Sequence, residues 1–398
     1  MTRFTIASFN VKNLIGPDQE YYPYESYTPE EYAWKEDWMA DQLLTMNADI
    51  VCFQEIFERS PLWQIVEETN RRGAELNADV IPDKSKRYHR KAIFQKLRYD
   101  TYGEGSLFFA PNANDSGQPG RRRPGLAVLS RTGFVEEPKV TQVLDEPLTI
   151  SFSNFDGSDA GSYTITKISR PLVCARIPLG DRVVSVFNCH LKSKLGEFPR
   201  PSGASFAPEA NLLDYDPYGR AVGSIRSSVR RMAEAAVLRK LILEELQAGF
   251  PVMSLGDYND GEHSTSSSVI SGERPFRNYA WMRRHDAEHR SDRYTDEEDA
   301  QIRQSIEAVQ MVSAEKLFVR KSLKDVVYTS AFGGVHESID QILMSRHFHP
   351  EDPDALGEME YFSTLNDHIT DGSHPEAPYN KLASDHGQII AHMRLFNS

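Results

Sequence analysis

Side chains suited to acid–base and phosphate chemistry follow the end of one apolar run near the middle of the chain. The run Pro251–Gly256 has the length of a buried strand, and Asp257, Tyr258, Asn259 and Asp260 come directly after it. Side chains alternate along extended backbone, so Asp257 and Asn259 point to the same side. Gly, Asp and Asn are also ordinary turn residues, so this pattern alone fits a plain strand exit equally well.

The same arrangement recurs at the ends of other apolar runs, with different polar residues: Asn10, Glu55, His190, Asp385 and His386. Each has an ordinary structural explanation, as a turn asparagine, an interior histidine or a loop aspartate. A carboxylate after a buried strand is more informative, because its burial is costly unless it is paired or bound to a cation. The recurrence predicts one site assembled from several strand ends.

The residue types in this set predict metal-assisted hydrolysis of a phosphate ester by direct attack of water. Glu55 and Asp385, with the side-chain oxygen of Asn10, are the hard ligands that Mg²⁺ or Mn²⁺ prefers. The two histidines can act as acid, base or phosphate-polarising groups near neutral pH. Asp257 and Asn259 can position a water and hydrogen-bond the charge that develops on the phosphorus oxygens.

Other chemistries fit the sequence less well. It contains no Gly-x-Ser-x-Gly elbow, no Gly-x-x-x-x-Gly-Lys-Ser/Thr phosphate loop and no His-Glu-x-x-His pair. Ser384, Asp385 and His386 are the residue types of a serine hydrolase. Neighbours in sequence cannot form a hydrogen-bonded triad in that order, however.

Alternating and apolar runs predict the strands that position these groups, at residues 4–9, 50–53, 125–130, 182–188, 251–256, 338–344 and 388–395. Two or three more strands are predicted between residues 148 and 177, broken by a Gly/Asp/Ser turn as in an antiparallel hairpin. Capping boxes at Thr28–Glu31 and Thr295–Glu298 start two helices, and Leu62–Gly73 and Val229–Leu241 predict two more. No repeat or linker divides the chain, which predicts one domain over residues 1–398.

Composition limits the class of protein. The 398 residues carry a formal net charge of -13, which argues against coating nucleic acid by general electrostatics but permits a local basic face. Cys52, Cys174 and Cys189 lie in apolar runs and are expected to be reduced core cysteines. We find no leader and no apolar stretch near the roughly 20 residues of a membrane span. A cytoplasmic protein without a membrane partner is expected, although a processed mature chain would look the same.

Seven motifs in this order resemble the endonuclease/exonuclease/phosphatase superfamily, the deoxyribonuclease I-like fold: Phe9-Asn10-Val11, Gln54-Glu55, Pro124–Ser130, Asn188–Leu191, Gly256–Asn259, Ile339–Ile342 and Ser384–His386. The resemblance spans residues 4–395, and His190-Leu191-Lys192-Ser193-Lys194 is most similar to a bacterial nuclease-like branch. It implies an α/β fold, a four-layered sandwich of two mostly antiparallel sheets packed face to face with outer helices. The active site is then expected at one end, where strand-end loops meet.

The resemblance also implies a role for each motif residue. Asn10 and Glu55 would hold the metal, and Asp385 would assist the metal or water network. Asp257 and Asn259 would place the attacking water and the scissile phosphate.

The histidines receive separate roles. His386 would lie at the phosphate, oriented by Asp340, and His190 near the leaving group or a phosphate oxygen. Lys192 is expected to bind substrate. Whether Asp257 or a histidine takes the water's proton stays open, since coupled groups can share that role.

Lys12 departs from the family pattern, because many relatives carry Asp or Glu two positions after the motif asparagine. A cation there would disfavour a second metal ion and could meet a substrate phosphate. The alternative, held at equal weight, is that Lys12 points to solvent.

The fold does not decide the substrate. Our first hypothesis is a nuclease, supported by possible backbone-binding clusters at Lys84–Arg98, Arg121–Arg123 and Arg226–Arg231, and by stacking aromatics in the loop Gly196–Gly223, including Phe206. The second hypothesis is a phosphatase or phosphodiesterase for a small or lipid phosphoester. A catalytically dead binding scaffold is the third, disfavoured because the presumed acids, histidines and asparagines are all present. Oligomeric state is left unknown.

Overall fold

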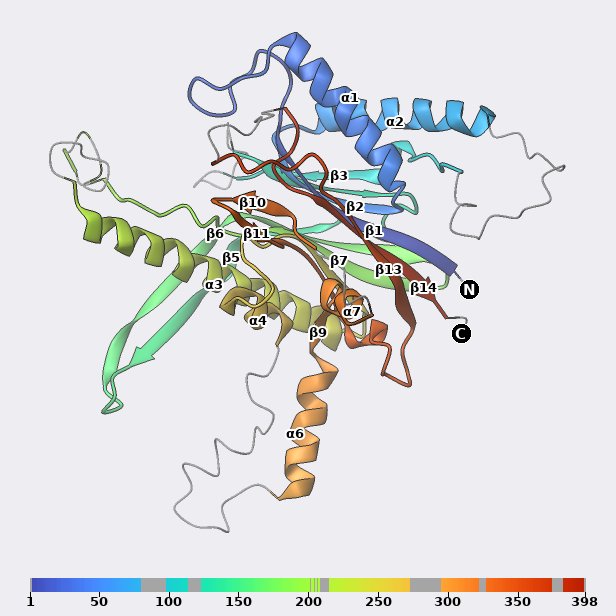
Figure 1. Ribbon diagram of the computed structural model, residues 1–398. Helices are drawn as coiled ribbons and strands as arrows, with labels where there is room; N and C mark the ends of the chain where they lie inside the picture. Colours follow the sequence, from blue (N-terminus) through green and yellow to red (C-terminus); the bar gives the residue numbers. More distant parts are fainter. Residues whose placement is uncertain are drawn as a thin grey trace.

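The computed structural model describes residues 2–79, 98–113, 123–200, 202–203, 205, 207, 215–272, 295–321, 327–373 and 382–396. The basic tract Lys84–Arg98, except Arg98, lies outside the described residues, as do Phe206 and the Arg121 and Arg122 members of the arginine cluster. Helices and strands fill most of the described chain (Figure 1).

The first sheet has six strands in the order β13 (Gly357–Leu365), β14 (Gln388–Leu395), β1 (Thr2–Leu14), β2 (Ile50–Ile56), β4 (Gly125–Ser130) and β3 (Leu107–Ala110). Its only parallel pair among the described strands is β1–β2. The two chain ends therefore lie at the same end of this sheet, where β1 begins and β14 finishes (Figure 1).

The second sheet also has six strands, in the order β5 (Lys139–Ser153), β6 (Asp159–Leu179), β7 (Arg182–His190), β8 (Val252–Asp257), β12 (Asp340–Ser345) and β9 (Met311–Ser313). Among its described pairs, only β7–β8 is parallel. The β5–β6 hairpin projects away from the sandwich (Figure 1). A separate two-stranded sheet joins β10 (Ser330–Phe332) to β11 (Val335–Glu337).

Three apolar layers hold the sheets and helices together. The central layer packs alternate residues of the two sheets against each other, for example Ile6 of β1 and Leu255 of β8. A second layer lies between the first sheet and helices α1 (Pro29–Met46) and α2 (Arg59–Asp79). A third lies between the second sheet and helices α3 (Pro217–Gln247) and α4 (Thr265–Ser271). This confirms the predicted four-layered α/β sandwich with mostly antiparallel sheets and outer helices (Figure 1).

Both predicted capping boxes are present. Thr28 caps α1, and Thr295 caps α6 (Asp296–Ala308), each with the reciprocal bond from the glutamate three residues on. A short helix, α7 (Ala314–Lys321), and two 3₁₀ turns at Glu104–Ser106 and Arg346–Phe348 complete the described helices. None of the helices in the described part of the chain is long and apolar enough to cross a membrane. The division into a single domain stays a prediction.

The strands run further than their apolar residues predict. β1 continues from the predicted end at residue 9 to Leu14, and β2 continues from residue 53 to Ile56. Asn10 and Glu55 are therefore inside strands, where the sequence predicted residues just beyond them. Register shifts between Asn10 and Leu14 and between Gln54 and Ile56 mark bulges, and the strand pairing continues beyond them.

Candidate active site

Strand ends from both sheets converge on one buried polar cluster at the edge of the central apolar layer. Asn10 continues the side-chain row of Phe4 and Ile6 in β1, and Asp257 continues the row of Met253 and Leu255 in β8. The alternation that fills the sandwich core with apolar groups thus ends, in each sheet, with polar groups that face one another. Asn10, His190, Asp257 and Asp340 are all buried.

Asp257 is the centre of this cluster. Its Oδ2 atom lies 3.2 Å from Nε2 of His190 and 3.2 Å from Nδ2 of Asn10. Asn259 donates two hydrogen bonds to the same carboxylate. Its backbone N–H donates to Oδ1 at 2.7 Å, and its Nδ2 donates to Oδ2 at 3.2 Å. Asn10 comes from the first sheet and the other residues from the second sheet or its adjoining turn, so the carboxylate joins both halves of the sandwich.

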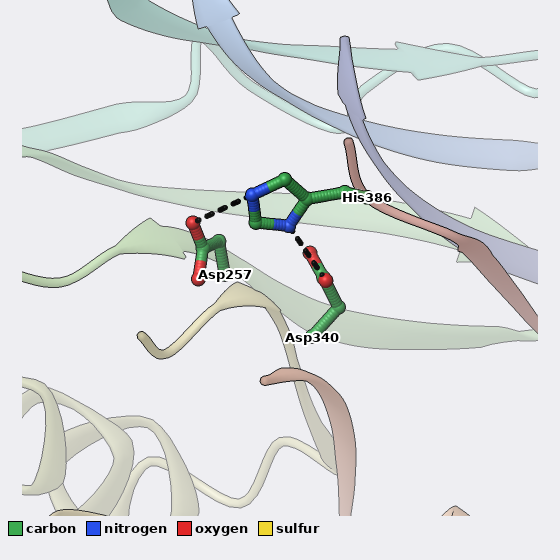
Figure 2. A group of neighbouring side chains, drawn as sticks. All are labelled: Asp257, Asp340 and His386. Atoms are coloured by element: carbon green, nitrogen blue, oxygen red, sulfur yellow. Dashed lines mark hydrogen bonds and ion pairs between the residues drawn. The ribbon is translucent and has the colours of Figure 1, made fainter. Parts of the chain in front are cut away.

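His386 lies between two buried carboxylates (Figure 2). Its Nδ1 atom is 2.8 Å from Oδ2 of Asp340, and its Nε2 atom is 3.9 Å from Oδ2 of Asp257. The hydrogen bond to Asp340 fixes the ring so that Nε2 is directed to the side of Asp257. The motifs imply that Asp340 orients His386 at a phosphate, and that role stays a prediction.

The electrostatics of the cluster separate its pKa values. Burial acts to raise the pKa of Asp257, but the nearby rings of His190 and His386 outweigh it, so its pKa lies below the ordinary value. Burial acts to lower the pKa of His386, but Asp340 and Asp257 outweigh it and raise the pKa well above 6.5. Burial raises the pKa of Asp340, and His386 opposes that rise. A carboxylate at Asp257 beside an imidazolium at His386 is the favoured state.

Glu55 is placed by a bulge and by backbone in an unusual conformation. It is the extra residue between Gln54 and Ile56 in the β2–β4 ladder, and its φ is 64°. Lys12, Asn13 and Asn259, with φ of 54°, 57° and 53°, share this left-handed region. Four of the seven non-glycine residues of positive φ in the described chain thus surround one site, and strained backbone of this kind clusters at functional sites.

The donor set around Glu55 fits a divalent cation. Oε1 of Glu55 lies 3.4 Å and Oδ2 of Asp257 lies 3.2 Å from the same Asn10 nitrogen, so two carboxylates converge there. A hard cation would offset their repulsion, and their oxygens keep unused lone pairs to bind one. Asn10 presents its Nδ2 to both carboxylates, while its Oδ1 accepts from the Lys12 backbone N–H at 3.1 Å. An oxygen ligand from Asn10 would require the amide to turn, so that role stays a prediction.

Among the described residues, Asp257, Asp340 and His386 also have ligand atoms within 4.8 Å of one another. We interpret this trio as a proton-sharing network in place of a metal site, because the Nδ1–Oδ2 contact of 2.8 Å is already a hydrogen bond.

Three predicted residues lie at the edge of the cluster. Asp385 is exposed, next to His386 in the chain. Lys12 is half-buried, and its carbonyl accepts from the Tyr27 hydroxyl at 3.3 Å. Lys192 is half-buried, with its Nζ donating to the Leu195 carbonyl at 3.1 Å. The metal role of Asp385 and the substrate roles of both lysines therefore stay predictions.

The sequence did not predict Lys35, a fully buried lysine on α1. Its Nζ donates to the carbonyl of Val11 at 2.8 Å and to that of Leu382 at 3.0 Å. The Ser384 hydroxyl adds a third tie, donating to the Asn10 carbonyl. Lys35 thereby joins β1 to the segment that carries Asp385 and His386. The available signal was its place on the apolar face of Met39 and Leu43, at four-residue spacing.

Two further polar groups connect the layers beneath the site. Gln54 of the first sheet donates to Oδ1 of Asn188 in the second at 2.8 Å, and Asn188 donates back to the carbonyls of Phe53 and Ala127. Asp260 accepts from Nε of Arg231 at 3.1 Å and from the Ser266 hydroxyl. It therefore ties the turn after β8 to α3 and α4.

No protein-family model matches the chain, and no curated protein matches it. Solved structures similar to it include an endonuclease/exonuclease/phosphatase family protein from Bacteroides thetaiotaomicron, at 12% identity over 98% of this chain and 97% of that one, with a TM-score of 0.45. A mannosyl-6-phosphatase from the same organism has 12% identity over 98% and 100% of the two chains and a TM-score of 0.45. The human Nocturnin catalytic domain has 14% identity over 99% and 95%, with a TM-score of 0.41.

Proposed function

We propose that this chain is a metal-dependent phosphoester hydrolase of the endonuclease/exonuclease/phosphatase type, acting on phosphodiester bonds of DNA or RNA by direct attack of water. One observation carries the proposal. Asp257 accepts hydrogen bonds from Asn259 and lies beside His190, His386 and Asn10 in one buried cluster. A carboxylate held ionised in this cluster can orient a water and accept its proton.

The residues divide the work as follows. Asp257 accepts a proton from the attacking water, and Asn259 fixes the direction of that carboxylate through its two hydrogen bonds. His386, kept charged by Asp340, donates from Nε2 to a phosphate oxygen and so stabilises the charge that develops in the transition state. His190, whose Nε2 lies 3.2 Å from Oδ2 of Asp257, serves the leaving-group side.

Glu55 is the residue best suited to hold Mg²⁺ or Mn²⁺, with Asn10 and Asp385 as the proposed further ligands. When bound, such an ion polarises the phosphoryl oxygen and offsets developing negative charge. The bulge at Glu55 and the Asn13 backbone N–H, which donates to Oε2 at 3.1 Å, hold that carboxylate in place.

A panel of substrates tests this function: single- and double-stranded DNA, RNA, bis-p-nitrophenyl phosphate and small phosphomonoesters, each with Mg²⁺ or Mn²⁺. Hydrolysis of nucleic acid that EDTA abolishes and that Asp257→Ala or His386→Ala removes is the expected result. Turnover of only small or lipid phosphoesters would favour the phosphatase alternative. Absence of any hydrolysis, with intact folding by circular dichroism, would contradict the proposal and favour a binding scaffold.

A further inference from the structure

A groove of about 830 Å³ adjoins the catalytic cluster at the base of the β5–β6 hairpin. Most of its lining comes from Tyr163–Arg170 of β6, and the rest includes Lys192 after β7, Arg230 of α3 and Tyr22 of the loop before α1. Five cationic side chains line it: Arg123, Lys167, Arg170, Lys192 and Arg230. The described residues of the lining include no acidic residue. In a chain of net charge -13, such a concentration of one sign marks a surface for an anion.

Nearby acids offset only part of this charge. Glu197 lies 3.6 Å from Arg230, so it screens one guanidinium. Glu234 is buried and accepts backbone N–H bonds from Ser169 and Lys192, both at 2.8 Å, so it supports the groove floor. Apart from these two acids beside it, the described lining of the groove carries cations and no acidic residue.

One carbonyl oxygen accepts hydrogen bonds both from the groove and from the catalytic cluster. The oxygen of Leu191 accepts from NH1 of Arg170 at 3.1 Å and from Nδ2 of Asn259 at 3.0 Å. Arg170 is thus one hydrogen-bonded group away from a residue that holds Asp257. A phosphate next to the one being cleaved would meet Arg170 first and Lys192 beside it.

The aromatic ring of Tyr22 lies in the groove lining, near the candidate metal ligand Glu55. Tyr22 lines the groove, is 39% exposed, and interacts electrostatically with both Glu55 and Arg170. Its ring packs edge-on against Tyr21 and Phe57, at centroid distances of 5.6 and 6.4 Å. A partly exposed aromatic ring beside a row of cationic side chains is the arrangement that stacks bases of a single strand.

We propose that this groove binds a single nucleic-acid strand, with its flanking phosphates along Arg170, Lys192, Arg230 and Lys167 and a base against Tyr22. The inference rests on the proposed function and narrows its substrate class to a polyanion extending beyond the scissile phosphate toward the hairpin. A phosphomonoester would leave most of the groove unfilled.

Binding without turnover tests the groove separately from catalysis. In EDTA, fluorescence anisotropy would measure a labelled single strand of about 12 nucleotides, within the site size of single-strand grooves, against a dinucleotide and a duplex of the same sequence. We expect the single strand to bind at least about tenfold more tightly than the dinucleotide. Its log affinity should fall with log salt by about 0.7 for each phosphate contacted.

Lys167→Gln and Arg230→Gln are the test variants, and Lys240→Gln is the matched control. Lys240 is 63% exposed on the same helix as Arg230 and does not line the groove. Each groove variant should weaken strand binding several-fold and reduce the salt slope by about 0.7, and in turnover it should raise KM more than it lowers kcat. The control should bind as the unaltered protein does.

The outcomes separate the two proposals. The proposed groove would be overturned if phosphoesters are hydrolysed but the dinucleotide and the longer strand bind equally well. It would also be overturned if the groove variants bind the strand as Lys240→Gln does. In both cases the proposed function would still stand. Tighter binding of the duplex than of the single strand would also overturn the proposed groove. Strand binding that depends on Lys167 and Arg230 supports the groove even where the activity panel shows no hydrolysis.

Discussion

Asp340 and Asp257 lie directly opposite each other in the antiparallel pairing of β12 with β8. Like charges at facing positions of two strands repel. The ring of His386 enters between them and contacts both carboxylates, at 2.8 Å and 3.9 Å (Figure 2). Because a charged His386 offsets this repulsion, the protonated form of its ring is strongly favoured.

Asp340→Asn should lower the pKa of His386. Burial alone lowers the pKa of this ring, and Asp340 is the largest of the three charges that raise it, ahead of Asp257 and Asp385. The ring carbon protons of His386, followed by NMR from pH 5 to 9 in EDTA, should titrate above 6.5 in the unaltered protein and lower in the variant. Asp260→Asn, which alters a carboxylate that bonds Arg231, is the control and should leave the titration in place.

The sign of the stability effect follows from the same shift. Because the folded-state pKa of His386 is raised above 6.5, its stabilising contribution is complete below 6.5 and is lost as pH rises through the raised value. A titration of His386 below 6.5 in the unaltered protein would contradict both statements.

Asp257→Asn should reduce hydrolysis by about 10²- to 10⁴-fold, the range for removing a general base or a main charge of the transition state. The amide keeps the size of the side chain but cannot accept the water's proton. Steady-state kinetics with the best substrate of the panel would measure kcat and KM. Asp260→Asn in the same turn should instead lower the thermal midpoint while retaining most of kcat, and equal losses in both variants would refute the assignment.

Lys35→Met should stabilise the protein most at low pH. Burial lowers the pKa of Lys35 to about 7, with Lys12 adding to the shift and Glu55 and Asp385 opposing it. A lysine with a depressed folded-state pKa destabilises the fold where it must be charged, so the unaltered protein gains stability as pH rises from about 7 toward 10.5. Urea unfolding at several pH values should show the advantage of the variant shrinking over that interval.

The same variant should lose activity despite its stability. Without the ammonium, the carbonyls of Val11 and Leu382 lose their shared donor, and the segment carrying His386 is no longer tied to β1. A loss of about 10- to 100-fold is expected, as for other residues that orient ligands and bases. Met39→Ala, at the next position on the same buried helix face, is the control that should lose stability with little change in kcat. A stable Lys35→Met variant with normal kcat would show that the two hydrogen bonds of Lys35 do not position the site.

Gly256→Ala should disrupt folding next to the site. An added Cβ would lie 1.9 Å from the Cys189 carbonyl oxygen, and the φ of 143° is one that residues with side chains rarely adopt. β7 and β8 would have to separate, at a cost of about 3 kcal/mol or more. Gly249→Ala has a φ of 86° but meets no atom within 4 Å, so it should cost only about 1–2 kcal/mol. Thermal unfolding of both variants compares them, and similar midpoints would contradict the steric argument.

The fold was largely predictable because the determining signals are local. Thr28 with Glu31 starts α1, and alternating runs such as Ser338–Met344 predict strands, here β12 at Asp340–Ser345. Part of the candidate site was predictable because His190 and Asp257 follow apolar runs at strand ends. Asp340 begins β12 and was identified only by the motif resemblance. These signals do not depend on what the chain contacts elsewhere.

The residues that escaped prediction act through contacts between distant parts of the chain. Lys35 bonds Leu382, which is 347 positions away, and Arg170 reaches the Leu191 carbonyl from a neighbouring strand. Nothing in the sequence around Lys35 or Arg170 identifies those acceptors. The positions of Asn10 and Glu55 inside strands were missed for a related reason, since a bulge depends on the register of the partner strand.

The Gln54–Asn188 hydrogen bond joins the two sheets directly below a site whose parts they share. Asn10 and Glu55 belong to one sheet, and His190 and Asp257 to the other, so the site exists only while the sheets are docked. Enzymatic turnover is therefore a reporter of docking. A folding intermediate with one formed sheet would have native secondary structure and no activity, and recovery of turnover during refolding would time the final closure of the sandwich.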